Sequence, residues 1–134
     1  MQKPYSPTQD LRILVVDDAA MILTMVTNLL ASIGFRQITT ADSVKSALEK
    51  FPRLEKCPFD AILLDLYLRD GTGINVIKAV RARDKDVPII MLTQEDEAKK
   101  VVDIIAQGAT DYIVKPFTED LLIKKLERAF GRPL

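Results

Sequence analysis

The chain has 134 residues, 19 basic and 19 acidic side chains, no histidine, no tryptophan and one cysteine, Cys57. This length and a hydrophobic content of 48% indicate one compact domain with a core rather than a disordered chain. The balanced charge argues against direct binding of nucleic acid, and the single cysteine excludes an internal disulfide. The absence of histidine excludes a Ser-His-Asp triad and most zinc sites.

The first ten residues are polar and contain Pro4 and Pro7, which is typical of neither a signal peptide nor a membrane anchor. We expect residues 1–10 to be an extension, residues 11–131 to form the domain, and no output domain to follow. The uncharged segment 19–35 is shorter than the roughly 20 apolar residues that a membrane span requires, and polar residues interrupt it. The sequence therefore predicts a cytoplasmic protein with no membrane partner.

Short apolar segments alternate with segments of helical periodicity along the chain. The predicted strands are Arg12–Val16, Gln37–Thr40, Ala61–Leu64, Val87–Leu92 and Tyr112–Val114. All but the second are continuous and rich in Ile, Val and Leu, which is typical of strands buried on both faces of a parallel sheet. The helical stripes are Ile22, Met25, Val26, Leu29 and Ile33; Val44, Ala47 and Leu48; Ile74, Ile77 and Val80; Ala98, Val101, Val102 and Ile105; and Leu122, Leu126, Ala129 and Phe130.

The helix boundaries agree with this alternation, because typical stop and cap residues stand beside the stripes. They are Gly34, Pro52, Gly108 and Gly131 after the first, second, fourth and last helices, and Thr118 before the last. The pattern predicts an α/β fold of five strand–helix repeats, (βα)5, in which helices cover both faces of a parallel sheet.

Reactive side chains follow four of the predicted strands. Asp17 and Asp18 follow the first strand, Asp65 the third, Thr93 the fourth and Lys115 the fifth. Open α/β sheets bind ligands beyond the carboxyl ends of their strands, at the point where the strand order reverses. If the order is 2-1-3-4-5, the first and third strands are neighbours there, and the three carboxylates converge.

Three carboxylates in one crevice repel one another unless they are protonated or bridged by a cation. Mg²⁺, with Mn²⁺ as an alternative, would take a few carboxylate oxygens and keep waters for a phosphate group. Each residue also has an ordinary alternative, because Asp17, Asp18 and Thr93 could cap helices, whereas Asp65 and Lys115 could be solvated. Their joint position at the strand ends favours a site where a phosphoryl group is placed on a carboxylate.

Four segments carry these residues: Ile13–Asp18, Ile62–Leu66, Ile89–Thr93 and Gly108–Phe117. Together they resemble the response-regulator receiver domain of two-component signalling over about residues 11–130, and they are most similar to the single-domain chemotaxis type. The resemblance implies a flavodoxin-like, doubly wound, five-stranded parallel sheet in the order 2-1-3-4-5.

The resemblance also implies a role for each residue of the site. Asp65 would accept a phosphoryl group from a phosphohistidine on a histidine kinase or a histidine phosphotransfer protein. The metal ligands would be Asp17, Asp18, Asp65 and the backbone carbonyl of Tyr67, with Asp18 binding Mg²⁺ directly and Asp17 mostly through water. Lys115 would pair with the phosphoryl oxygens. The protein would then be a stoichiometric phosphoacceptor that can dephosphorylate itself, rather than an enzyme.

In such domains the phosphoryl group operates a switch. Thr93 would swing toward it and Tyr112 would turn inward, which changes the face formed by the fourth helix, the fifth strand and the fifth helix. That face would bind a downstream protein or a second copy of the chain. The Lys115–Pro116 bond is commonly cis in the family.

The chain departs from the usual receiver pattern at three positions. Arg69 stands where a proline is usual, Gln94 follows Thr93 where a small residue is usual, and Tyr67 places a bulky side chain at the rim. We expect Tyr67 and Gln94 to affect how fast Asp65 is phosphorylated and dephosphorylated rather than to change the chemistry.

The first helix is predicted to be a docking surface for the partner that carries the phosphohistidine. Its inward stripe leaves Met21, Leu23 and Leu30 without an obvious core role, and exposed apolar residues beside a site are typical of partner surfaces. Deeper burial of the helix is the alternative.

Other functions remain open at this point. A flavodoxin-like FMN binder needs a hydroxyl- and glycine-rich phosphate loop where Asp17 and Asp18 stand. A phosphatase of the haloacid dehalogenase type carries its nucleophile after the first strand in an Asp-x-Asp motif, which is absent at Asp17. A slow or degenerate receiver would act only as an interaction scaffold, and the chain could also be a receiver fragment of a hybrid kinase or a larger regulator.

Overall fold

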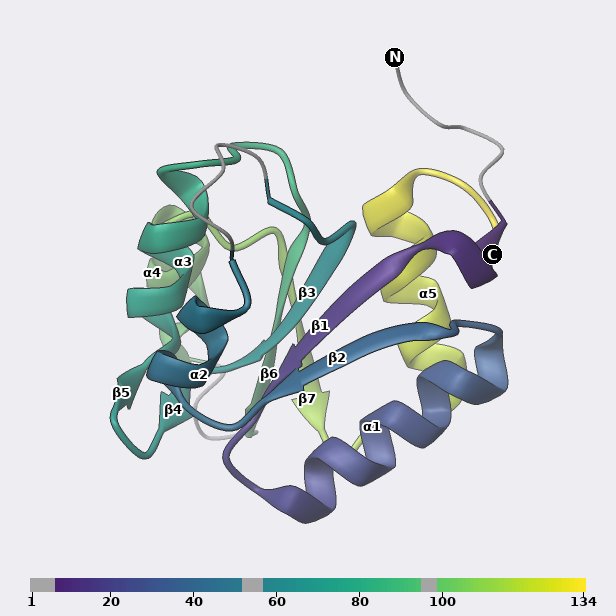
Figure 1. The fold of residues 1–134 in the computed structure, drawn as a ribbon, viewed down its shortest axis with the longest axis horizontal. Coiled ribbons are helices and arrows are strands. Elements are labelled where there is room, and N and C mark those ends of the chain that lie inside the picture. The colour runs from purple at the N-terminus through teal and green to yellow at the C-terminus, as the bar shows by residue number, and fades with distance from the viewer. Residues whose placement is uncertain (1–6, 52–56, 95–98) are drawn as a thin grey trace.

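The computed structural model describes residues 7–51, 57–94 and 99–134 and contains one five-stranded parallel sheet (Figure 1). Its strands are β1 (Arg12–Val16), β2 (Gln37–Ala41), β3 (Ala61–Asp65), β6 (Ile89–Gln94) and β7 (Asp111–Lys115). The strand order is β2-β1-β3-β6-β7, so the expected order 2-1-3-4-5 is confirmed. The order reverses between β1 and β3, which places the ends of these two strands side by side.

Helices cover both faces of the sheet (Figure 1). The α1/α5 face carries α1 (Ala20–Ile33) and α5 (Glu119–Phe130). The α2/α3/α4 face carries α2 (Val44–Glu49), α3 (Gly73–Arg81) and α4 (Val101–Ala106). A short 3-10 helix, Thr8–Asp10, precedes β1, and no helix in the described ranges is long and apolar enough to cross a membrane.

The predicted helix ends agree with the structure where it describes them. α1 ends at Gly34 and α5 at Gly131, and both glycines have positive φ, which favours a residue without a Cβ atom. The Thr118 side chain accepts a hydrogen bond from the backbone N–H of Leu121 and so caps α5, as predicted. Pro52 and Ala98, which the helix predictions used, lie outside the described residues.

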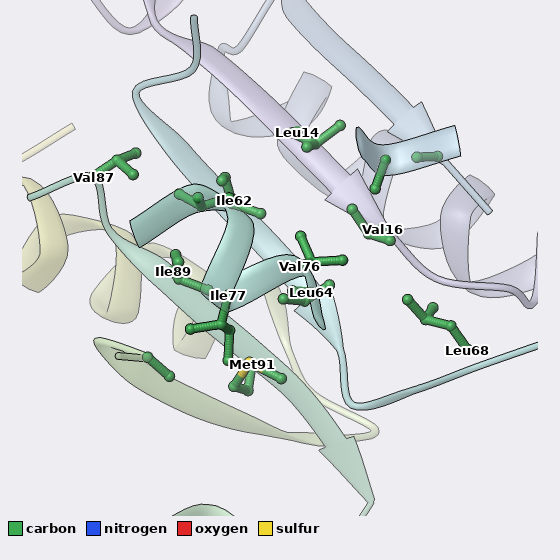
Figure 2. Packing of buried hydrophobic residues seen from close by; sticks show 14 of the residues in the cluster. Leu14, Val16, Ile62, Leu64, Leu68, Val76, Ile77, Val87, Ile89 and Met91 are labelled. Carbon is green, nitrogen blue, oxygen red and sulfur yellow. The ribbon is translucent and has the colours of Figure 1, made fainter. Parts of the chain in front are cut away.

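The central strands β1, β3 and β6 are buried on both faces because successive side chains point to opposite helix layers, whereas the edge strands β2 and β7 are mostly half-buried or exposed. The residues that pack against the α2/α3/α4 face are Leu14, Val16, Ile62, Leu64, Ile89 and Met91, together with Val76 and Ile77 of α3 (Figure 2). The alternate residues pack against the α1/α5 face, and they are Ile13, Val15, Leu63, Ile90 and Leu92.

Four of the strands extend one or two residues beyond their predicted ends, and two further local features differ. The fourth strand begins at Ile89 rather than Val87, because the backbone N–H of Val87 donates to the Asp84 side chain and Pro88 has no N–H to donate. A hairpin of β4 (Tyr67–Leu68) and β5 (Gly71–Thr72) follows β3, and strands of two residues are too short to produce a hydrophobic period.

The prediction that Leu30 is an exposed docking residue is wrong. Leu30 is fully buried and packs in the same cluster as Val26 and the α5 residues Leu122 and Leu126, because α1 contacts both the sheet and α5 and therefore buries a wide arc of its surface. Leu23 is half-buried against this cluster. Met21 alone of the three is largely exposed, at 83%.

Candidate functional site

The carboxyl ends of β1 and β3 bring three aspartates together. Val16 lies beside Leu64 in the parallel register, so Asp17 and Asp65 come next along neighbouring strands. One carboxylate oxygen each from Asp17, Asp18 and Asp65 lies within 4.8 Å of the others. Asp17 and Asp65 are buried, whereas Asp18 is exposed. The predicted convergence is therefore confirmed, and it results from the register of β1 and β3.

Asp17 also has a structural role. One of its carboxylate oxygens accepts a hydrogen bond of 2.9 Å from the backbone N–H of Ala19, directly before α1. Its other oxygen is 2.8 Å from the Lys115 ammonium. Asp17 thus divides its two oxygens between the backbone before α1 and Lys115, whereas α1 itself has no side-chain cap, so the capping alternative is not what the structure shows.

Lys115 extends from the end of β7 into the carboxylate cluster. Its ammonium donates to Asp17 and lies 3.5 Å from a carboxylate oxygen of Asp65. The Lys115–Pro116 bond is cis, as the family resemblance implies. One ammonium beside three carboxylates leaves an excess of formal negative charge, which suits a hard divalent cation with oxygen ligands such as Mg²⁺.

Thr93 and Gln94 complete the end of β6. Thr93 is buried, one residue beyond Leu92, the register partner of Asp65, and its hydroxyl donates to the backbone carbonyl of Gln94 at 3.3 Å. The Gln94 side chain is exposed, beside Lys115 in the register of β6 and β7. Both residues therefore lie at the carboxyl end of β6, between the strands that end in Asp65 and Lys115.

The chain turns sharply after Asp65, and Gly73 allows this turn. A Cβ atom at Gly73 would lie 2.6 Å from the backbone oxygen of Asp65, closer than such atoms approach. The Gly73 N–H donates to the backbone oxygen of Leu66, which closes the β4–β5 hairpin against the end of β3. Sequence analysis assigned no role to Gly73, because the contact depends on a loop that returns to its own strand.

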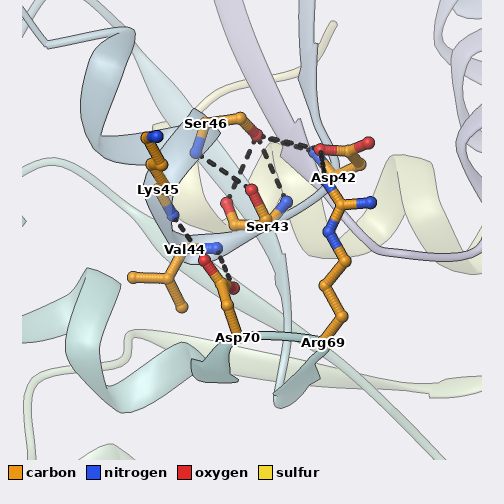
Figure 3. Close-up of polar contacts among 7 residues, drawn as sticks. All are labelled: Asp42, Ser43, Val44, Lys45, Ser46, Arg69 and Asp70. Carbon is orange, nitrogen blue, oxygen red and sulfur yellow. Dashed lines mark hydrogen bonds and ion pairs between the residues drawn. The ribbon is translucent and has the colours of Figure 1, made fainter.

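The tip of the hairpin is attached to α2 (Figure 3). The Asp70 carboxylate accepts hydrogen bonds from the backbone N–H groups of Val44 (2.7 Å) and Lys45 (3.0 Å). These bonds, that from Lys45 above all, hold the pKa of Asp70 below its ordinary value. Arg69 forms an ion pair of 3.1 Å with Asp42. The residue that replaces the usual proline thus takes part in fixing the hairpin.

Tyr67 and Tyr112 each contact the ammonium of a lysine. Tyr67 is 42% exposed, and its hydroxyl accepts a 2.7 Å hydrogen bond from the Lys100 ammonium. Tyr112 is half-buried against the core of the α2/α3/α4 face, with the Lys125 ammonium 5.1 Å from its ring centroid. Lys125 also pairs with Asp111 at 2.9 Å. Tyr112 therefore has one face in the core and one against a cation.

The chain thus has an acidic pair after β1, an aspartate at the end of β3, and a threonine and a lysine at the ends of β6 and β7, and it matches a known family. The model of the response regulator receiver domain matches residues 13–127, most of the chain. This chain belongs to the response regulator receiver domain family. Its fold is the flavodoxin-like α/β fold that the resemblance implied.

Known relatives of this receiver domain include chemotaxis proteins. It is 36% identical to chemotaxis protein CheY of Pseudomonas aeruginosa over 124 residues, which cover 91% of this chain and 98% of the relative. It is 35% identical to chemotaxis protein CheY-3 of Vibrio cholerae, covering 92% of this chain and 95% of the relative.

Solved structures agree with the sequence comparisons. CheY4 of Vibrio cholerae superposes with a TM-score of 0.77 at 37% identity, covering 89% of this receiver domain and 98% of that chain. The receiver domain of a sensor histidine kinase from Pseudomonas aeruginosa has a TM-score of 0.77 at 30% identity, covering 90% and 98%, and holds a magnesium ion in its active-site cleft. The three aspartates here offer the oxygen ligands that such an ion takes.

Proposed function

We propose that this receiver accepts a phosphoryl group on Asp65 from a phosphohistidine of a histidine kinase or a histidine phosphotransfer protein. The supporting observation is the Lys115 ammonium, which lies 2.8 Å from Asp17 and 3.5 Å from Asp65, inside a cluster that also includes Asp18. Asp65 adjoins the other two aspartates and lies 3.5 Å from the lysine, so it can meet both the ion and the ammonium. Asp17 is held by Ala19 and Lys115, and Asp18 is exposed.

The transfer exchanges one bond for another. A carboxylate oxygen of Asp65 forms a bond to phosphorus while the bond from phosphorus to the histidine nitrogen breaks, and the electron pair of that bond returns to the imidazole. Asp17 and Asp18 would hold Mg²⁺, which supplies charge neutralisation for the phosphoryl oxygens when it is bound. Lys115 would supply a further positive charge, and the Thr93 hydroxyl a hydrogen bond. The protein acts stoichiometrically in this scheme and is not an enzyme.

The output would be a change of the face formed by α4, β7 and α5. Movement of Thr93 toward the phosphoryl group would free space that the half-buried Tyr112 ring can fill. The domain would then exist in two conformations, with the ring outside or inside this space. The phosphoryl group shifts the equilibrium between them only as far as it binds one conformation better than the other. The exposed apolar residues Val102 and Ile105 of α4 suit binding of a downstream protein or a second copy of the chain.

Labelling with radioactive acetyl phosphate and Mg²⁺ tests the proposal. We expect the parent chain to take up label and Asp65→Asn to take up none while remaining folded. Asp120→Asn, which removes an exposed carboxylate on α5, is the matched control and should label like the parent. Stoichiometric labelling of Asp65→Asn would refute the assignment, and an unlabelled parent would favour a scaffold without phosphorylation.

Metal binding is a separate test. Mg²⁺ should raise the melting temperature, because a ligand that binds only the folded state stabilises it. Asp18→Ala should weaken Mg²⁺ binding most, as the proposed direct ligand, whereas Asp120→Ala should leave it unchanged. Equal Mg²⁺ affinity in Asp18→Ala and the parent would place the ion elsewhere.

A further inference from the structure

The outer side of β2 is an open edge of the sheet. In the described part of the chain, β2 pairs only with β1 and stands at one end of the strand order (Figure 1). The edge strand at the other end, β7, carries the charged residues Asp111 and Lys115 at its two ends. β2 contains no charged residue and no proline, although natural proteins use both on edge strands to prevent pairing with another chain. The β2 edge is thus suited to accept a further strand.

One hydrogen bond identifies the backbone groups that face outward. The N–H of Asp17 donates to the carbonyl oxygen of Ala41 at 3.1 Å, so the backbone groups of Ala41 face β1. This direction alternates along a strand, so Thr39 also faces β1, whereas Ile38 and Thr40 face away from the sheet. Ile38 and Thr40 therefore offer N–H donors and carbonyl acceptors to a strand laid alongside them.

Two hollows follow this edge. One, of about 430 Å³, is lined by residues 36–39 and by basic side chains that include Arg12 and Lys50. The other, of about 260 Å³, is lined by residues 40–42, by Leu23 of α1 and again by Lys50. Every residue from 36 to 42 thus borders free space, and the side chains of an added strand would find room there.

The charge along the edge changes sign from one end of β2 to the other. Arg36 directly precedes the strand and is exposed, in the hollow that also holds Arg12, whose backbone N–H binds the nearby Asp60. Asp42 directly follows the strand, and its side chain is still 48% exposed although Arg69 binds its Oδ1 oxygen. A strand with opposite charges at its two ends is complementary to an antiparallel copy of itself.

We propose that two copies of this chain pair through their β2 strands, antiparallel and related by a twofold axis at Thr39. In this register Ile38 lies opposite Thr40 of the partner copy, so the outward-facing backbone groups exchange hydrogen bonds. Arg36 lies opposite Asp42 of the partner copy at both ends of the interface, which is isologous. The charges select a second copy of the chain, and its formal net charge of zero leaves no overall repulsion between copies.

This dimer requires no phosphoryl group and is independent of the proposed function of Asp65. Its interface lies at the β2 edge, whereas the proposed output face includes β7, at the other end of the strand order. Because the paired strands are antiparallel, the carboxylate clusters of the two copies lie at opposite ends of the joined sheet. Both clusters and both output faces therefore stay accessible in the dimer.

The first test is the mass of the unphosphorylated chain in solution. Sedimentation equilibrium should give a mass that rises from 15.0 kDa toward twice that value as the concentration is raised. Arg36→Glu creates a like-charged pair at each end of the interface and should raise the dissociation constant of the dimer roughly tenfold or more. Arg128→Glu, the same charge change at an exposed residue of α5, is the matched control and should dimerise like the parent.

A mixing experiment tests the pairing of Arg36 with Asp42. Asp42→Lys should also weaken the dimer, because it places a lysine opposite Arg36 of the partner copy. In a mixture of Arg36→Glu and Asp42→Lys chains every charge faces its opposite, so the mixture should dimerise with the affinity of the parent.

The backbone pairing has a test of its own. Thr40→Pro removes an N–H that β1 does not use, so the variant should keep the circular dichroism spectrum of the parent but lose the dimer. In the parent, amide hydrogen exchange of Ile38 and Thr40 should slow as the concentration is raised.

Other results would overturn the dimer. A parent chain that stays monomeric up to roughly 1 mM would refute it and would favour an extended segment of another protein at this edge. A dimer that resists Arg36→Glu and Thr40→Pro would lie on another face. A mixture that dimerises no better than its folded components would contradict the register, and if Asp42→Lys does not fold, the Arg36→Glu and Thr40→Pro results decide. Labelling of Asp65 is unaffected by any of these outcomes.

Discussion

The two faces of the sheet are held by different kinds of interaction. On the α1/α5 face, helices of 14 and 12 residues bury continuous apolar stripes against the strands. On the α2/α3/α4 face, α2 and α4 have only six residues each, and polar side chains fix the segments around them. Asp70 binds the first turn of α2, and Arg81 binds the backbone oxygen of Gly108 after α4.

The difference follows from helix length. A six-residue helix is too short to be stable alone and buries little apolar surface, so hydrogen bonds from neighbouring loops must position it. The loops that supply these bonds on the α2/α3/α4 face also border the carboxylate cluster, since Arg69 and Asp70 belong to the hairpin that follows Asp65. The position of the short helices on the α2/α3/α4 face thus depends on a few polar contacts, some of which come from the hairpin beside the site.

The largest loss of stability is expected for a substitution on the α1/α5 face. Leu30→Ala should lower the free energy of unfolding by about 2–5 kcal/mol, because it removes a fully buried side chain between α1, the sheet and α5. Urea denaturation measures the loss. Met21→Ala, on the same helix but 83% exposed, should change stability by less than about 0.5 kcal/mol. Similar losses in both variants would contradict the burial of Leu30.

The next largest effect is expected at Arg81, which holds the segment after α4. Its guanidinium donates to the backbone oxygens of Gly108 (2.8 Å) and Asp84 (3.1 Å) and to the Thr110 hydroxyl (3.4 Å). Arg81→Met keeps the aliphatic packing but removes these hydrogen bonds, which should cost about 1–3 kcal/mol in urea denaturation. A loss no larger than that of Arg69→Ala would show that this tether is dispensable.

A smaller, pH-dependent effect is expected at Asp70. Because its pKa is lowered in the folded chain, the carboxylate contributes stability above the ordinary aspartate pKa of 3.8, and this contribution is lost as the pH falls through the lower folded value. Asp70→Ala should therefore melt at a lower temperature than the parent at pH 7, and the difference should shrink at strongly acidic pH. A difference that stays constant with pH would point to a cause other than the charge.

The smallest effect is expected at the Arg69–Asp42 ion pair. Its side chains are 64% and 48% exposed, so water screens the attraction. Arg69→Ala should change the free energy of unfolding by no more than about 1 kcal/mol, and the change should decrease further at high salt. A larger loss would mean that the pair, rather than the Asp70 cap beside it, fixes the hairpin to α2.

The strand ends of the site were predictable from the sequence for a simple reason. A strand that is buried on both faces reads as an uninterrupted apolar run, so Asp17 and Asp65 are recognisable as the first charged residues after the apolar runs of β1 and β3. The family resemblance then supplied the strand order and the roles. The exposed position of Met21 was also predicted, because this residue lies outside the apolar stripe by which the first helix faces the sheet.

The burial of Leu30 was not predictable in the same way. A helical stripe gives the direction of the sheet but not the width of the buried arc, which depends on how closely α5 approaches α1. Gly73 is a similar case, since its need for a small side chain is set by the backbone of Asp65 across a returning loop.

The sequence by itself determined the alternation of strands and helices and the chemistry available at the strand ends, because hydrophobic periodicity and residue type are local properties of the chain. Only the tertiary structure decided which distant side chains meet, because that depends on register and helix placement. Lys115 reaches Asp17, 98 positions away, and Lys100 reaches Tyr67, 33 positions away, through contacts that no local pattern encodes. The tether of Arg81 to Gly108 joins α3 to the loop before β7 in the same manner.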